Sequence, residues 1–128
     1  MFLVDELSGD CAFGLCALLR AHLELDGFLI SYGTAPLEAA LRNARDYLAL
    51  ANHSCIPVFS GADSPLVTPL FMNPIPRFYG LEGKVGVDFR TLTTGDIALP
   101  PEAAGTATDF FEPLRNAQKG GSLSFFAF

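Results

Sequence analysis

The sequence predicts an α/β fold with an open, mostly parallel, Rossmann-like sheet and helices on both faces, truncated after about four strands. Short apolar segments alternate with helical patterns in the order strand, helix, strand, helix, strand, long loop, helix, strand. This order is typical of right-handed crossovers between parallel strands. Half of the residues are hydrophobic and the mean hydropathy is +0.34, as expected when strands are buried on both faces. A length of 128 residues fits one domain.

The first two elements are a strand and a helix. The apolar run 2–4, FLV, stops at Asp5 and is followed by the polar turn ELSGD, as a buried strand opening into a loop would be. Apolar side chains then recur at three- and four-residue steps, which predicts an amphipathic helix ending around residues 22–26. These side chains are Ala12, Leu15, Cys16, Leu19 and Leu23.

A second strand and a second helix follow. Residues 27–33, GFLISYG, form the strand. Thr34 and Pro36 mark the helix start, because a hydroxyl caps free N–H groups and proline lacks the N–H that a first turn leaves unpaired. One face of the helix is a continuous apolar stripe. Its members are Leu37, Ala40, Leu41, Ala44, Leu48 and Ala51.

The outer face and the end of the second helix are polar. Arg42, Arg45 and Asp46 are expected on the solvated face. Asn52 and His53 end the helix, and we expect His53, like His22 near the end of the first helix, to be solvated.

The third strand, CIPVFSG at residues 55–61, leads into a long Pro/Gly-rich segment. From about residue 62 to 104 the chain loses clear periodicity, and its length is typical of a functional or partly ordered loop. A hairpin around residues 83–92 is left open as an alternative.

A third helix and a last strand complete the pattern. Thr106 or Thr108 caps the helix, and Pro113 implies that the helix either starts late or kinks. Residues 122–128, SLSFFAF, form the last strand. The helix is expected to turn four side chains inward, namely Phe110, Phe111, Leu114 and Ala117.

Composition excludes several classes of function. A net charge of −6 and a pI near 4.6 exclude nucleic acid as a partner, since a polyanion is repelled. Apolar runs fall short of the ~18 residues that a membrane span needs, and the acidic N-terminus is not a secretory signal, so the expected location is the cytoplasm. Cys11, Cys16 and Cys55 lack the spacing of a disulfide framework or zinc site and are expected to be small buried hydrophobes.

Four stretches match motifs of a known family in order and spacing. They are FLVDELSGD at 2–10 for D-x-D-x-G-x-D-D, GFLISYGTAPLEAALRNA at 27–44 for G-[IV]-T-T-V-x-G-N followed by N-A, IPVFSGADSPL at 56–66 for I-P-V-x-x-G-A-x-x-P-L, and FYGLEGKVG at 78–86 for H-G-x-D-G-L-G. Residues 107–128 are similar to the helix and strand that follow. The chain thus resembles the inosine/uridine-preferring nucleoside hydrolase family, whose members cleave the N-glycosidic bond of ribonucleosides in purine and pyrimidine salvage.

The resemblance implies a calcium site at the acidic turn. In the family, calcium binds a water and the ribose hydroxyls, and an Asp takes the proton of that water as it attacks C1′. Calcium is a hard cation with roughly six to eight oxygen ligands. The family's first Asp falls on Asp5, but an ungapped alignment places Leu7, Cys11 and Ala12 at the other Asp positions, and thiol or apolar groups do not replace carboxylates.

The candidate site residues are therefore few. Asp5 is the catalytic remnant, and Asp5 and Asp10 are the metal remnants if the turn is two residues shorter than in the family. Thr34 stands at the ribose-contacting Asn, and Tyr79 and Glu82 stand at the His and Asp of the H-G-x-D-G-L-G motif. The family's second-half ligands have no counterpart after residue 128. Beside these roles, Asp5 also fits a turn cap and Thr34 a helix cap.

Three functions remain open for residues 1–128, taken as a partial nucleoside hydrolase-like domain. The first is a truncated, inactive form in which calcium is lost. The second is a non-catalytic interaction module that pairs with an intact paralogue or with itself. The third is binding of a nucleoside or ribose without hydrolysis, which requires Asp5, Asp10 and Thr34 to converge.

The last strand bears on whether the chain folds alone. Phe125, Phe126 and Phe128 would each contribute about 1.5–3 kcal/mol if buried. An uncovered apolar edge strand promotes association. The sequence therefore predicts a chain that self-associates or is marginally folded.

Overall fold

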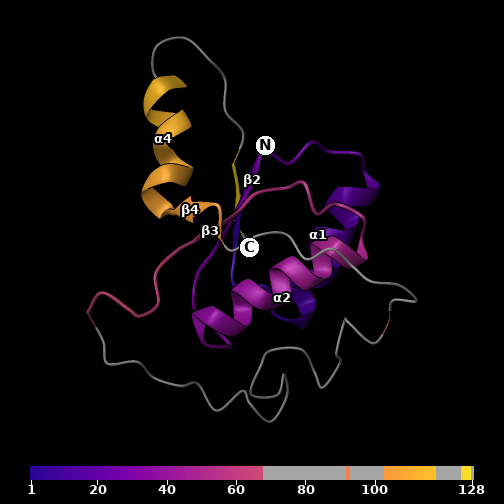
Figure 1. Ribbon diagram of the computed structural model, residues 1–128, viewed down its shortest axis with the longest axis horizontal. Helices are drawn as coiled ribbons and strands as arrows, with labels where there is room; N and C mark the ends of the chain where they lie inside the picture. Colours follow the sequence, from indigo (N-terminus) through magenta and orange to yellow (C-terminus); the bar gives the residue numbers. More distant parts are fainter. Residues whose placement is uncertain (68–91, 93–102, 118–124, 128) are drawn as a thin grey trace.

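The computed structural model describes residues 1–67, 92, 103–117 and 125–127 (Figure 1). The elements alternate as the sequence predicts, and the α/β fold with a parallel sheet is confirmed. In chain order they are β1 (Phe2–Asp5), α1 (Gly9–Arg20), β2 (Gly27–Ile30), α2 (Leu37–Leu50), β3 (Val58–Ser60), β4 (Gly105–Thr106), α4 (Ala107–Ala117) and β5 (Phe125–Ala127). None of the helices in these ranges is long and apolar enough to cross a membrane.

The strands form one five-stranded sheet in the order β4-β3-β2-β1-β5, and each pairing is parallel. The chain runs from β1 outward to β3 in one direction and returns to place β5 on the other side of β1, so the topological switch point lies at β1. Strand β5 thus lies beside β1, where the fourth strand of the usual doubly wound order lies. The two-residue β4, paired with β3 through Phe59 and Gly105, was not predicted, because so short a strand has no periodicity of its own.

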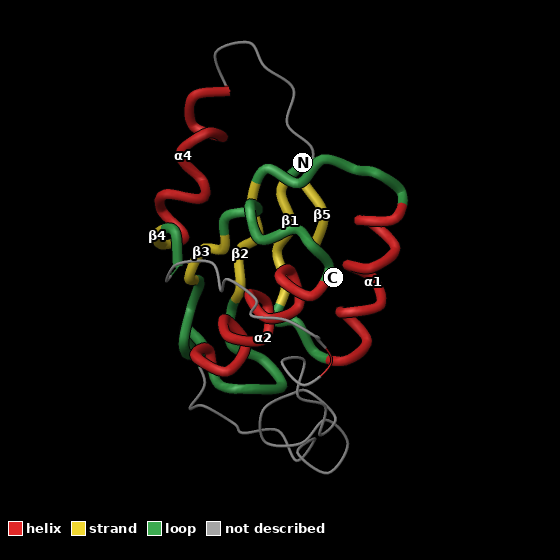
Figure 2. Tube along the Cα trace, turned by 45° about the vertical axis from the view of Figure 1, so that its right-hand side comes forward, coloured by secondary structure: helices red, strands yellow, loops and turns green. Residues whose placement is uncertain are grey.

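The helices cover both faces of the sheet (Figure 2). Helices α1 and α2 pack on one face over a core of ten buried residues. They are Leu3, Leu7, Leu15, Phe28, Ile30, Ala40, Ala44, Leu48, Ile56 and Val58. Helix α4 packs on the opposite face, where Phe110 is 1% exposed and meets Leu29, with Val4 and Phe59 around them. Burial on both faces explains the high hydrophobic content.

The α2 helix departs from the expected pattern at two points. Its N-cap is Pro36, without a side-chain cap, so Thr34 lies outside the helix and is not its cap. The helix also buries a wider arc than its apolar stripe, because Asn43 and Asp46 are both buried. The prediction that Asp46 lies on the outer face is wrong: hydropathy marks the core of a buried face but not its margins.

The first turn of the α4 helix is tied back to the residue before it. The Asp109 carboxylate accepts hydrogen bonds from the N–H (2.7 Å) and the hydroxyl (2.9 Å) of Thr106, the residue before the helix. Thr106 therefore marks the start, and Pro113 lies inside the helix, which does not start late. Phe111 is 38% exposed, so its predicted inward position is wrong.

Predictions for the end of α1 and for the burial of the cysteines differ from the structure, and others lie outside its described residues. Helix α1 ends at Arg20, and Leu23 lies beyond it and is exposed. The cysteines are free thiols, as expected, but Cys55 is exposed and Cys11 and Cys16 are half-buried, so the prediction that they are buried is wrong. The predicted hairpin at 83–92, Tyr79, Glu82 and Phe128 lie outside the described residues, as do most of the loop 62–104 and the side chains of Phe125 and Phe126.

Candidate functional site

The candidate site lies where the first two strands end. Strands β1 and β2 run in parallel, and Asp5, the last residue of β1, is in register with Ile30, the last residue of β2. Because parallel strands end at the same edge of the sheet, the turns that follow Asp5 and Ile30 meet there. Ligands of open α/β sheets bind at this edge, near the switch point.

Asp5 is 3% exposed, and its two carboxylate oxygens have different surroundings. Oδ1 accepts hydrogen bonds from the backbone N–H of Glu6 (2.6 Å) and of Leu7 (3.4 Å). Within the described residues, Oδ2 is buried without a hydrogen-bond partner. Asp5 is thus a turn cap through Oδ1, whereas Oδ2 of this carboxylate, which lies beside the Cys11 thiol, is buried without a partner at hydrogen-bond geometry. A buried carboxylate oxygen in this position is costly and calls for an explanation.

Glu6 links the end of β1 to the turn after β2. Its Oε2 accepts the backbone N–H of Thr34 at 2.7 Å. Gly33 makes room for this contact, since a Cβ at Gly33 would lie 1.2 Å from Glu6 Oε2. The Thr34 hydroxyl is buried and, among the residues described, makes no hydrogen bond. Asp5 and Thr34 therefore each hold a buried oxygen without a partner at neighbouring strand ends, with Glu6 between their backbones.

Asp10 does not join this group. It lies in the first turn of α1, is exposed, and accepts a hydrogen bond from the buried Ser8 hydroxyl at 2.5 Å. The interaction suits an acidic residue at a helix N-terminus. The structure thus brings Asp5 and Thr34 to one edge and turns the Asp10 carboxylate toward Ser8 at the helix start.

The remaining positions of the acidic turn are occupied by non-ligands. Leu7 is 3% exposed and belongs to the hydrophobic core. Its φ of 48° lies in the left-handed region of backbone conformation. Burial raises the pKa of the Cys11 thiol to about 11; its hydrogen bond with Ser8 lowers the pKa and the neighbouring Asp5 carboxylate raises it. Sulfur is in addition a soft ligand, which suits a hard cation such as calcium poorly.

These donors do not fit a calcium ion. Calcium takes roughly six to eight oxygen ligands. The turn offers the free oxygens of Asp5 and Thr34, a neutral thiol at Cys11 and an apolar side chain at Leu7. Across the described ranges, no three His, Cys, Asp or Glu residues lie where they could hold a metal ion.

Sequence reasoning reached Asp5 and Thr34 but missed Glu6. The residue carries no motif signal, and its role depends on the pairing of β1 with β2, which places it beside a turn 28 residues away in sequence. The adjacent glycine was a usable signal, because Gly33 precedes Thr34 where the chain leaves β2 and allows a close approach.

Comparisons with known proteins agree on one family. The family model described as inosine-uridine preferring nucleoside hydrolase matches residues 4–127. An uncharacterized protein of Schizosaccharomyces pombe is 32% identical over 122 residues, which cover 91% of this chain and 35% of that protein. The chain therefore spans about a third of the length of this relative.

Solved structures show the same fold. The purine-preferring ribonucleoside hydrolase from Gardnerella vaginalis matches with a TM-score of 0.69 and 23% identity, over 99% of this chain and 39% of that one. An inosine-guanosine nucleoside hydrolase matches with a TM-score of 0.62 and 18% identity, over 98% of this chain and 37% of that one. Neither substrate preference extends to this chain at such identities.

Proposed function

The chain belongs to the inosine-uridine preferring nucleoside hydrolase family, and from this premise we propose that it is an inactive member that has lost the family's calcium site. In this proposal residues 1–128 are a partial domain in the cytoplasm, with Asp5 as the remnant of the catalytic and metal-binding group and Thr34 as the remnant of a ribose contact. The chain releases no ribose from inosine or uridine.

The observation that carries the proposal is the identity and burial of the residues in the acidic turn. At two positions that an ungapped alignment pairs with further Asp residues of the family, Leu7 is part of the hydrophobic core and Cys11 is a thiol beside Asp5. Replacing Leu7 by a carboxylate would bury a charge in that core, so the turn is built for packing. A hard cation would find at most a few of the oxygens that it needs.

Ribose release from inosine and from uridine tests the proposal, with the full chain at high concentration in calcium and an active nucleoside hydrolase as the positive control. We expect no turnover above buffer, and no heat of calcium binding in calorimetry. Turnover that depends on calcium and disappears in Asp5→Asn would refute the proposal, because Asp5→Asn keeps the size and the Oδ1 acceptor of the turn cap while removing the charge.

A second function, pairing with an intact paralogue or self-association, is favoured by the sheet and by α1. Strand β5 ends the strand order, and on the described part of the sheet it pairs with β1 alone. Phe13 on α1 is 81% exposed. An edge strand promotes association, and an exposed aromatic side chain adds apolar surface that a partner could cover. Sedimentation of the isolated chain tests it: a monodisperse monomer that also fails to co-purify with a full-length family member would exclude this function.

A further inference from the structure

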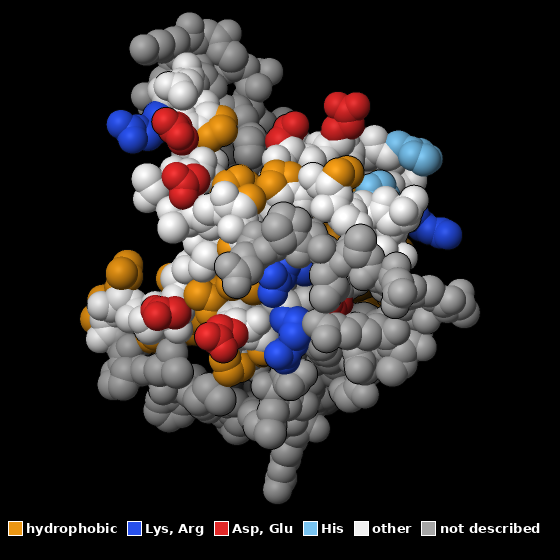
Figure 3. Space-filling model, in the orientation of Figure 1, with side chains coloured by type: hydrophobic (Ala, Val, Ile, Leu, Met, Phe, Trp, Pro, Cys, Tyr) orange, Lys and Arg blue, Asp and Glu red, His pale blue; other side chains and the backbone are white. Residues whose placement is uncertain are grey.

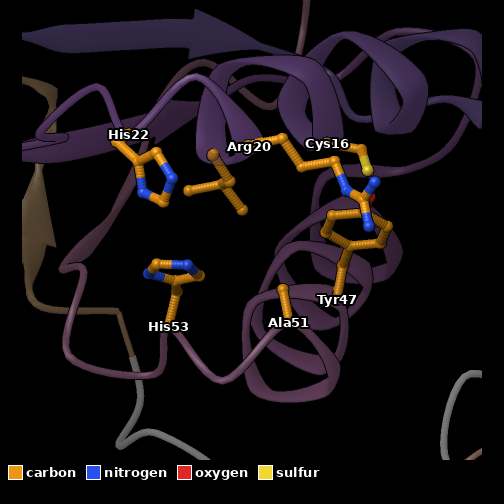
Figure 4. Close-up of a pocket in the computed structure, with 7 residues that line it drawn as sticks. Cys16, Arg20, His22, Tyr47, Ala51 and His53 are labelled. Carbon is orange, nitrogen blue, oxygen red and sulfur yellow. The ribbon is translucent and has the colours of Figure 1, made fainter.

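The chain has two histidines, and they lie together on one surface (Figure 3). His22 follows α1 and His53 follows α2, 31 positions later, so their proximity is a product of the tertiary fold. Both line an open cavity of about 510 Å³ between the two helix ends. In this cavity the two imidazoles face each other from opposite sides (Figure 4).

Backbone hydrogen bonds fix the chain at the position from which the first imidazole extends. Helix α1 ends in a left-handed cap at His22, whose φ is 55°. The His22 N–H donates to the carbonyl of Leu19 (3.2 Å) and the Leu23 N–H to that of Leu18 (3.4 Å). This is the Schellman pattern, in which glycine or asparagine is usual at the left-handed position. A histidine there accepts backbone strain that a glycine would avoid.

Helix α2 ends in the same way. The left-handed residue is Asn52, with a φ of 62°, and its N–H donates to the carbonyl of Ala49 at 3.0 Å. The His53 N–H donates to the carbonyl of Leu48 at 2.7 Å. Two matching caps therefore fix the backbone at both histidines before any ligand arrives, so binding has to order only the two side chains.

The other polar groups of the cavity are directed elsewhere. The Tyr47 hydroxyl donates to the carbonyl of Ala12 at 3.0 Å, and burial, followed by the neighbouring Cys16, raises the pKa of Tyr47 to about 12. The Arg20 side chain extends away from the imidazoles toward Tyr47 (Figure 4). Within the described ranges, neither imidazole takes part in a hydrogen bond or an ion pair.

We propose that His22 and His53 form a binding site for a borderline transition-metal cation such as Zn²⁺. Neutral imidazole nitrogens are good ligands for Zn²⁺, Cu²⁺ and Ni²⁺ and poor ones for Ca²⁺ or Mg²⁺. The carbonyl ends of two helices add partial negative charge, which favours a cation. No third His, Cys, Asp or Glu of the described residues completes the set, so in this proposal the two imidazoles share the cation with water molecules.

The proposed metal site is distinct from the candidate functional site at Asp5 and Thr34. Both histidines follow helix C-termini and precede strands β2 and β3, whereas Asp5 and Thr34 follow strands β1 and β2, at the opposite edge of the sheet. A metal at the histidines would join the ends of α1 and α2 and stabilise the helix layer on that face. The proposal does not depend on whether the chain hydrolyses nucleosides.

Calorimetric titration of the full chain with zinc chloride tests the proposal. We expect one Zn²⁺ per chain, a higher Tm in its presence, and no response to Ca²⁺. His22→Asn and His53→Asn should each weaken binding by at least about tenfold, because even losing a group that only orients a ligand weakens metal binding about 10- to 100-fold. Asparagine suits the left-handed conformation of residue 22, so His22→Asn keeps the helix cap.

Thiols are the competing ligands, and matched variants separate them. Cys55→Ser and Cys16→Ser should bind Zn²⁺ as the wild type does, and Co²⁺ should give no thiolate charge-transfer absorption. A wild type that does not bind Zn²⁺ would overturn the proposal. Binding that survives both histidine substitutions, or that is lost in a cysteine variant, would overturn it equally. Circular dichroism confirms that each variant is folded before titration.

Discussion

Gly33→Ala tests the contact that joins the two strand ends of the candidate site. The new Cβ would lie 1.2 Å from Oε2, 2.3 Å from Cδ and 2.8 Å from Cβ of Glu6. Glu6 must therefore move, and its hydrogen bond from the Thr34 N–H, 2.7 Å long, is lost. Gly33 has no left-handed φ, so the substitution itself adds no backbone strain.

The magnitude follows from two opposing effects. Losing a hydrogen bond to a charged group lowers the free energy of unfolding by about 1.5–3 kcal/mol. The smaller conformational freedom of alanine in the unfolded chain raises it by about 0.4–1 kcal/mol. We expect a net destabilisation of about 0.5–2.5 kcal/mol for Gly33→Ala.

Urea unfolding followed by circular dichroism measures the effect, in a double-mutant cycle with Glu6→Ala. In the Glu6→Ala background the Oε2 and Cδ clashes are absent, so Gly33→Ala should be less destabilising there by at least about 1 kcal/mol. Gly14→Ala in helix α1 is the matched control and should stabilise, since alanine is the better helix former. A neutral or stabilising Gly33→Ala, or additive effects in the cycle, would show that Glu6 does not occupy this position.

Two further predictions concern helix α4. Phe110→Ala should lower the free energy of unfolding by about 3–5 kcal/mol in urea melts, because the ring is fully buried and meets Phe59 edge to face, whereas exposed Phe111 should matter much less. Thr106 lowers the pKa of Asp109 from 3.8, so its stabilisation is present above that pH and lost as pH falls through the lowered value. Asp109→Asn should therefore unfold at a lower Tm than the wild type at pH 7 but not at acid pH; an equal gap at both would contradict this.

The fold was largely predictable because its signals are local. Apolar runs of strand length and stripes of helical period depend on neighbouring residues, and they located most elements of the sheet in the right order. The features that the sequence patterns did not predict share a cause. The two-residue β4 is a strand only because β3 lies beside it, and Asp46 is buried because of what the margin of α2 packs against. Neither depends on local pattern.

The location of Asp5 and Thr34 was predictable, whereas the roles assigned to them stay predictions. Family motifs pointed to Asp5 and Thr34, and the structure places both at neighbouring strand ends, each with a buried oxygen that lacks a partner among the described residues. Asp10 had the right charge but lies on an exposed helix turn. Spacing along the chain could not distinguish these outcomes, because the direction of a side chain depends on where the helix begins.

The sequence by itself determined the class of fold, the family and the small number of carboxylates in the acidic turn, since these depend on residue identity and order. Only the tertiary structure decided what the remaining residues do. It buried Leu7 in the core, set Glu6 against Thr34, and brought His22 and His53 to one cavity. The physical reason is that each contact joins segments distant in sequence, whose approach depends on strand pairing and helix packing across the whole sheet.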